Sequence, residues 1–229
     1  MVHSDVRIEL IVKLLRQDNP ECKSVVFERP INFDYEAGDW IDLDFADRSY
    51  SGGKTYSLSS SPTESELTIS FREGISPFKK KLQSVQTGDK MYISRYGNDY
   101  GFHLKNNRSS VLIAGGIGIA PFRSMLKEMS DMRVNDKVRL VYFNKSHDFL
   151  FQDELNEWKR IMPSISIEYI VTKELQRKTR QKLLESLIKD TAHNHYIAGP
   201  SGMVGSTLSL LEKTGIARKD IRIDNFGTY

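Results

Sequence analysis

The stretch Val111-Leu112-Ile113-Ala114-Gly115-Gly116-Ile117-Gly118-Ile119-Ala120-Pro121-Phe122 decides how the rest of the chain is interpreted. Its leading apolar residues fit a strand that is covered on both faces. The glycines let the backbone approach a ligand, and Pro121 suits the first turn of a helix. Because the amides at a helix start attract anions, the pattern predicts a dinucleotide phosphate site. A tight turn that needs its glycines only for packing is the alternative.

After this stretch, apolar runs alternate with helical patterns. Such alternation predicts an α/β domain with a doubly wound parallel sheet, whose ligands bind beyond the carboxyl ends of the strands. We expect helices at residues 122–130, 153–161, 179–188 and 203–213, and further strands at 138–143, 165–171, 195–198 and near 221.

The first hundred residues have a different pattern. Short runs such as 6–10, 40–45 and 67–71 alternate apolar and polar positions and are separated by turn residues. This period of two predicts an N-terminal antiparallel sheet that closes into a small β-barrel, interrupted by one helix at about 77–85. We expect the aromatic residues Tyr92, Tyr96, Tyr100 and Phe102 in the core and rim of this barrel. The predicted domains are residues 1–106 and 107–229.

Composition excludes several kinds of function. Lys and Arg total 33 against 30 Asp and Glu, so the net charge of +3 gives no reason to expect nucleic-acid or membrane binding. A single cysteine, Cys22, excludes an internal disulfide, a four-cysteine zinc site and an iron–sulfur cluster held by this chain alone. The N-terminus lacks the pattern of a secretory signal, and no apolar run reaches the roughly 18 residues of a membrane helix, so we expect a cytoplasmic protein.

Three further motifs are ambiguous by themselves. Residues 54–60, Lys-Thr-Tyr-Ser-Leu-Ser-Ser, could hold a planar ring and its phosphate, or form a polar edge strand. In residues 74–77, Ser76 is a good N-cap, which could face a second phosphate or cap a helix that binds nothing. Residues 196–203 form another strand followed by a Gly-Pro turn. The ordinary Rossmann pattern is weakened, because Pro121 stands where the last glycine would be and no acidic residue follows Phe143.

Taken together and in order, these motifs resemble the ferredoxin–NADP(+) reductase superfamily over essentially the whole chain. Residues 54–60 are similar to its Arg-x-Tyr-Ser-x-x-Ser flavin motif, with Lys54 in place of arginine. Residues 115–121 match its Gly-Gly-x-Gly-x-x-Pro motif. Residues 198–203 match its Cys-Gly-Pro-x-x-Met motif, with Ala198 in place of cysteine, and residues 224–226 resemble its acidic-x-Phe ending.

The resemblance implies roles for particular residues. Tyr56 would lie against the flavin ring, Ser57 would lie near flavin N5, and Lys54 would neutralise the flavin phosphate less firmly than arginine. It assigns catalytic positions to Tyr56, Ser57, Asp224 and Phe226. It assigns flavin binding to Lys54, Tyr56, Ser57, Ser60, Gly74 and Ser76, and nicotinamide-nucleotide binding to Gly115, Gly116, Gly118, Pro121, Thr172, Lys173, Arg177, Gly199, Pro200 and Met203.

The implied function is that of a flavoprotein oxidoreductase. Hydride would pass from NADPH or NADH to bound FAD, with FMN less favoured, and Thr172-Lys173 favour NADPH slightly. Electrons would then go to a separate acceptor: a ferredoxin, a flavodoxin, an oxygenase component or a small molecule. A flavin or ferric reductase that uses free flavin, and a non-catalytic regulatory subunit, are the alternatives.

Other polar residues are not assigned to sites. We expect His193 and His195 in a surface loop rather than at a metal, because no nearby cysteine or third ligand accompanies them. The run Lys79-Lys80-Lys81 is expected to keep an exposed helix face soluble.

Overall fold

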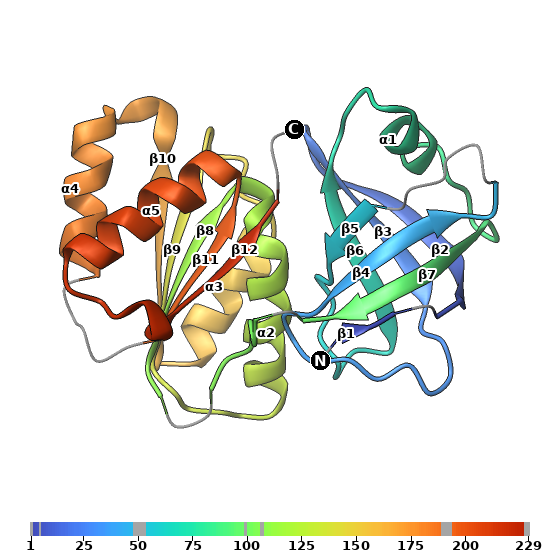
Figure 1. Cartoon of the computed structure of the whole chain (residues 1–229), viewed down its shortest axis with the longest axis horizontal. Helices are drawn as coiled ribbons and strands as arrows, with labels where there is room; N and C mark the ends of the chain where they lie inside the picture. Colours follow the sequence, from blue (N-terminus) through green and yellow to red (C-terminus); the bar gives the residue numbers. More distant parts are fainter. Residues whose placement is uncertain are drawn as a thin grey trace.

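Two domains lie side by side in the computed structural model, an antiparallel barrel and an α/β domain (Figure 1). The structure describes residues 2–4, 6–47, 54–98, 100–105, 108–188 and 194–226. The predicted boundary between residues 106 and 107 lies outside these described ranges. Phe102 is only 3% exposed and packs 5.6 Å from Phe122, between ring centroids, in the core of the second domain. The expectation that Phe102 belongs to the barrel was therefore wrong, and we propose that the domain boundary precedes it.

The barrel confirms the predicted antiparallel fold. Its strands follow the order β5-β4-β7-β2-β3-β6, and a bridge between Leu58 and Ile69 joins the two ends. Alternation explains the sheet, because Ile41 and Leu43 are fully buried while their neighbours are partly exposed. The described elements are β1 (Val2–His3), β2 (Ile8–Asn19), β3 (Cys22–Glu28), β4 (Trp40–Phe45), β5 (Lys54–Ser57), β6 (Glu66–Arg72), α1 (Pro77–Leu82) and β7 (Lys90–Gly97).

The second domain confirms the predicted doubly wound sheet. Its strands are all parallel, in the order β10-β9-β8-β11-β12. The strands are β8 (Ser110–Gly115), β9 (Val138–Asn144), β10 (Ile165–Val171), β11 (Asn194–Gly199) and β12 (Ile221–Asn225), and the helices are α2 (Ala120–Asp131), α3 (Gln152–Ile161), α4 (Arg177–Leu187) and α5 (Ser201–Lys213). Each helix begins one or two residues before its predicted start.

Helices cover both faces of this sheet. On one face, Phe122 and Leu126 of α2 join Trp158 of α3 in one core cluster. On the other, Leu184 of α4 and Leu211 of α5 join a second cluster. Figure 1 places α2 between the sheet and the barrel, so this helix contacts both domains.

The expectation that His195 lies in a surface loop was wrong. His195 is fully buried in β11, an interior strand of the sheet, because the strand already begins at Asn194. His193 lies outside the described residues. Within the described ranges, no helix is both long enough and apolar enough to span a bilayer.

Candidate functional site

The candidate site lies where the carboxyl ends of the parallel strands face the barrel. Gly115 ends β8, and Gly199 ends the adjacent β11. From β8 the chain adds β9 and β10 on one side, and it then adds β11 and β12 on the other side. The strand order therefore switches direction between β8 and β11, which is where ligands bind in doubly wound sheets. Two pockets occur here, one on each side of Arg72 and Ile117, which line both.

The first pocket brings together residues from both halves of the chain. Tyr56 and Ser57 of β5 line it, together with Phe226 from the far end of the sequence. Its lining residues are Thr55, Tyr56, Ser57, Ser70, Phe71, Arg72, Lys79, Ile117, Ala120 and Phe226. Four of the predicted catalytic positions therefore meet at or beside one pocket, since Asp224 is bonded to Ser57.

The contact between Ser57 and Asp224 joins the two domains. Ser57 Oγ donates a hydrogen bond to Asp224 Oδ2 at 2.6 Å. Asp224 retains some exposed surface, but protein atoms surround its carboxyl group, and this burial raises the pKa of Asp224 to about 6 against the opposing effect of the Ser57 hydrogen bond. The pair can therefore hold or release a proton near neutral pH.

Cations gather at the barrel side of the same pocket. Burial, then the neighbouring charges of Arg72 and Lys54, lower the pKa of Lys79. A bound anion would relieve this repulsion, so the cluster fits a phosphate-bearing ligand. Lys79 is partly buried and lines the pocket, whereas Lys80 and Lys81 are exposed. The expectation of a purely solubilising lysine run was thus wrong for Lys79.

Two predicted flavin contacts are engaged elsewhere. Ser60 is 2% exposed; its Oγ lies 3.0 Å from Tyr35 Oη and accepts a hydrogen bond from the Thr68 amide at 2.9 Å. Its hydroxyl therefore faces the barrel interior and lines neither pocket. Ser76 Oγ accepts from the Lys79 amide at 3.3 Å, so Ser76 is the N-cap of α1.

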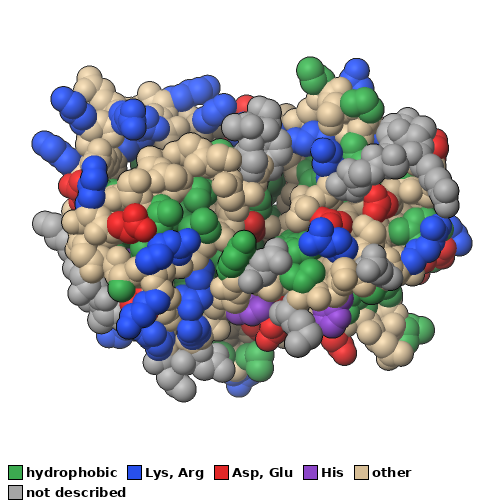
Figure 2. Space-filling view, in the orientation of Figure 1, with side chains coloured by type: hydrophobic (Ala, Val, Ile, Leu, Met, Phe, Trp, Pro, Cys, Tyr) green, Lys and Arg blue, Asp and Glu red, His purple; other side chains and the backbone are tan. Residues whose placement is uncertain are grey.

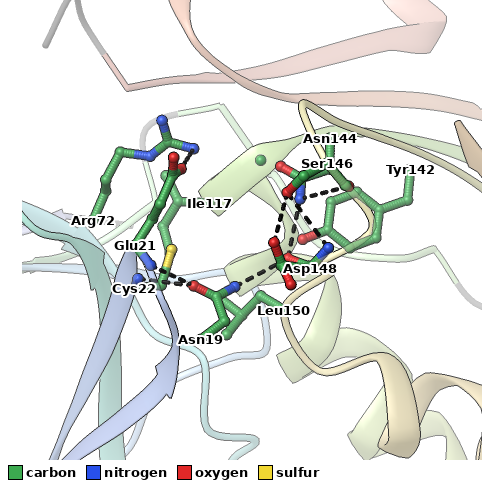
Figure 3. Close-up of a pocket in the computed structure, with 11 residues that line it drawn as sticks. Asn19, Glu21, Cys22, Arg72, Ile117, Tyr142, Asn144, Ser146, Asp148 and Leu150 are labelled. Carbon is green, nitrogen blue, oxygen red and sulfur yellow. Dashed lines mark hydrogen bonds and ion pairs between the residues drawn. The ribbon is translucent and has the colours of Figure 1, made fainter. Parts of the chain in front are cut away.

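The second pocket lies between the β2–β3 turn and the loop after β9 (Figure 3). Asn19 Nδ2 donates to the Asp148 carbonyl at 3.0 Å and so links the two domains across it. Arg72 pairs with Glu21 at 3.0 Å on its rim. The lining residues are Asn19, Glu21, Cys22, Arg72, Gly116, Ile117, Tyr142, Asn144, Ser146, Asp148 and Leu150. Burial raises the pKa of the Cys22 thiol to about 11, so it stays protonated at neutral pH.

The glycines of the turn serve different purposes. Gly116 has φ +55°, and a Cβ there would approach Arg72 and Asn144 no closer than 3.6 Å, so a side chain at this edge of the second pocket would make only ordinary van der Waals contacts. A Cβ on Gly118 would lie 2.2 Å from the Ala198 carbonyl oxygen. Gly118 is therefore required for packing against β11, the alternative explanation for such glycines.

The other predicted nucleotide contacts surround this turn. Met203 Sδ would lie 2.8 Å from a Cβ on Gly115 and 3.1 Å from one on Gly199, so the methionine packs over both strand ends. Pro200 precedes α5, and the buried Pro121 lies in the first turn of α2. Ala198, in the position of the family cysteine, is fully buried in the core.

The predicted specificity residues lie at the carboxyl end of β10. Thr172 and Lys173 form a 3₁₀ turn directly after this strand, and Arg177 begins α4. Figure 2 shows Lys and Arg side chains gathered over the α4 region. His147 Nε2 lies 2.6 Å from Glu174 Oε1, which ties the loop after β9 to this turn. Among the described residues, no group of three His, Cys, Asp or Glu side chains is placed to hold a metal ion.

Comparison with known proteins accords with this arrangement. Residues 112–208 match the sequence family described as "Oxidoreductase NAD-binding domain". A ferredoxin NADP+ reductase from Neisseria gonorrhoeae, solved with bound FAD and NADP, shares the fold with a TM-score of 0.81 at 19% identity, over 96% of this chain and 98% of that one. The chain therefore has the fold of this ferredoxin NADP+ reductase.

Curated proteins match parts of the chain. Sulfhydrogenase 2 subunit gamma from Pyrococcus furiosus is 34% identical over 126 residues, 54% of this chain and 42% of that protein. The 2-halobenzoate 1,2-dioxygenase electron transfer component from Burkholderia cepacia is 31% identical over 170 residues, 69% of this chain and 49% of that protein. The chain spans about half the length of these curated relatives.

Motif comparison with the ferredoxin–NADP(+) reductase superfamily did not identify Arg72 or Lys79. Arg72 ends β6 and Lys79 lies in the first turn of α1, so both flank the predicted Gly74–Ser76 segment. Cations beside a suspected phosphate contact were the available signal. Arg72 and Lys79 line one pocket because of the way β6, α1 and the second domain pack together, and a local sequence pattern does not predict that packing.

Proposed function

We propose that the chain is an NAD(P)H-dependent flavin oxidoreductase. One observation carries this proposal: the flavin-motif residues Tyr56 and Ser57 share a pocket with residues next to the glycine turn, and Ser57 is bonded to Asp224. A ring held by the barrel and a nucleotide held at the strand ends would therefore meet in one place. The neighbour from Neisseria gonorrhoeae, whose structure contains FAD and NADP, supports the choice of ligands.

The barrel side suits FAD. Tyr56 offers an aromatic face, and Lys54, Arg72 and Lys79 supply positive charge for its phosphates. Gly74 and Ser76 connect Arg72 to Lys79 and would act on this site by fixing the start of α1, where Ser76 is the N-cap. Ser60 would likewise act only on the position of its strand. FMN, with one phosphate, would use fewer of these cations.

The second domain suits the nicotinamide nucleotide. Gly115, Gly116 and Pro121 form the turn for its phosphates, and Gly199, Pro200 and Met203 border the nicotinamide. Thr172, Lys173 and Arg177 would face the adenosine end, where their positive charge favours the 2′-phosphate of NADPH.

Bound flavin would supply the redox chemistry, accepting hydride from the nicotinamide and releasing electrons to an acceptor. The protein's own contribution is alignment, which can supply about 7–11 kcal/mol of a reaction barrier. Ser57 Oγ donates to the Asp224 carboxylate, so a proton released in the pocket can move through Ser57 to Asp224. Phe226 lines the same pocket and limits access of water to it.

The electron acceptor is a separate molecule in this proposal. One cysteine cannot ligate an iron–sulfur cluster, so any cluster lies outside these 229 residues. The dioxygenase electron transfer component among the relatives supports an oxygenase partner; a ferredoxin, a flavodoxin or a small molecule fits the same pocket chemistry.

The test is an anaerobic titration of the purified protein, followed by visible absorption. Bands near ~370 and ~450 nm that bleach with NADPH at lower concentrations than with NADH would support the proposal. A protein purified without flavin that reduces added flavin would favour the free-flavin reductase. No reduction after incubation with FAD would contradict the proposal and favour a non-catalytic subunit.

Substitution of Lys79 tests the flavin site directly. Lys79→Met should weaken FAD binding by about one to two orders of magnitude, because a charge-assisted contact to phosphate contributes about 1.5–3 kcal/mol. Lys80→Met, on the exposed face of the same helix, is the matched control and should bind FAD as the wild type does. Equal FAD dissociation constants for both variants would remove Lys79 from the site.

A further inference from the structure

Arg123 is a buried arginine whose hydrogen-bonding capacity is fully used. It is 8% exposed and lies in the first turn of α2. Nε and Nη2 donate to the two carboxylate oxygens of Glu154, at 3.0 and 2.6 Å. Nη2 also donates to Glu64 Oε1 at 3.0 Å, and Nη1 donates to Glu64 Oε2 and, at 3.1 Å, to the Ser59 carbonyl. A guanidinium has five N–H groups, and each has a partner here.

These partners belong to different parts of the molecule. Glu154 lies on α3 of the same domain, whereas Ser59 lies within the flavin motif of the barrel and Glu64 lies shortly after that motif. The next residue, Ser124, adds a buried hydrogen bond of 2.7 Å from Oγ to the Ser60 carbonyl. The start of α2, which follows the glycine turn, is therefore fixed to the end of the flavin-binding segment.

Arginine is the only side chain that can make this junction. Two paired carboxylates each receive two N–H groups from one planar fork, which the single ammonium of lysine cannot supply. Without the guanidinium, Glu64 and Glu154 would repel one another across the domain boundary. Burial by itself would lower the pKa of Arg123. The hydrogen bonds to Glu154 and Glu64 outweigh this effect, so the pKa of Arg123 is raised and its charge is stabilised.

We propose that Arg123 is a positioning residue for hydride transfer, because it holds the nucleotide-binding turn at a fixed distance from the flavin-binding strand. The proposal rests on the function proposed above. Hydride transfer requires reacting atoms about 3–3.5 Å apart, and a displacement of about 1 Å can cost a factor of 10² in rate. Arg123 reaches neither pocket, so it acts through the elements it joins.

The first experiment is anaerobic single-turnover reduction of the flavin-loaded protein. Arg123→Lys should lower the limiting rate of flavin reduction about tenfold or more, while the dissociation constant for NADPH changes less than about threefold. The absorption band that arises when nicotinamide stacks on oxidised flavin should weaken in parallel. The matched control is Arg160→Lys, because Arg160 makes a two-bond pair with Glu157 on the exposed face of α3.

The second experiment needs no flavin or nucleotide. In a Cys22→Ala background, spin labels are attached at Lys80→Cys and Lys213→Cys, which are exposed positions in the two domains. Double electron–electron resonance then measures the distance between the two labels. Arg123→Lys should broaden the distance distribution, and Arg160→Lys should leave it unchanged. If Arg123→Lys does not fold, Glu64→Gln, which keeps the Arg123–Glu154 pair, should give the same broadening.

The two readouts separate failure of this inference from failure of the proposed function. A wild-type protein that NADPH does not reduce would contradict the function, while the label distances would still test the role of Arg123. An unchanged reduction rate and an unchanged distance distribution in Arg123→Lys would overturn the inference.

Discussion

At the scale of single residues, Asp224 carries the clearest pH dependence. Its pKa is raised from 3.8 to about 6, so the folded state binds a proton more tightly than the unfolded chain. Stability from this group is therefore greatest below pH 4 and falls as pH rises to about 6, by up to about 3 kcal/mol. Asp224→Asn lacks this loss. We expect its free energy of unfolding, relative to wild type, to increase by about that amount between pH 4 and pH 7 in urea titrations of flavin-free protein. A difference that does not vary with pH would show that the carboxyl group is not desolvated.

At the scale of elements, the β8–turn–α2 unit assigns separate roles to two glycines. Gly118→Ala places a Cβ against the β11 backbone, which cannot yield as a flexible side chain can, so we expect a loss of about 1–3 kcal/mol of stability. Gly116→Ala meets no such obstacle and should cost about 1–2 kcal/mol through its left-handed backbone, with weaker NADPH binding in addition. Urea unfolding and NADPH titration of both variants check this. Weaker NADPH binding in folded Gly118→Ala, with unchanged binding in Gly116→Ala, would reverse the assignment.

At the scale of the whole molecule, α2 couples the domains. Besides Arg123 and Ser124, Thr63 Oγ1 donates to Asp131 Oδ2 at 2.5 Å at the other end of this helix. We expect both domains to unfold in one transition. The chain has two tryptophans, Trp40 in β4 and Trp158 in α3. Trp158→Phe therefore leaves a single reporter in the barrel, and Trp40→Phe leaves a single reporter in the α/β domain. Coincident fluorescence midpoints in urea, after correction for each variant's stability by circular dichroism, would agree with coupling; two separate transitions within one variant would contradict it.

Local sequence pattern was sufficient to predict the kinds of element, their order and the parallel and antiparallel character of the two sheets. These follow from local periodicity and from turn residues such as Gly115 to Pro121, whose conformational preferences act over a few neighbours. Tertiary packing placed Lys79 at the pocket, directed Ser60 into the barrel and buried His195. It also decided that Arg123 joins Glu64 to Glu154. These outcomes depend on which segments, distant in the chain, pack against one another, and the hydrogen bonds and burial that result have no counterpart in local sequence pattern.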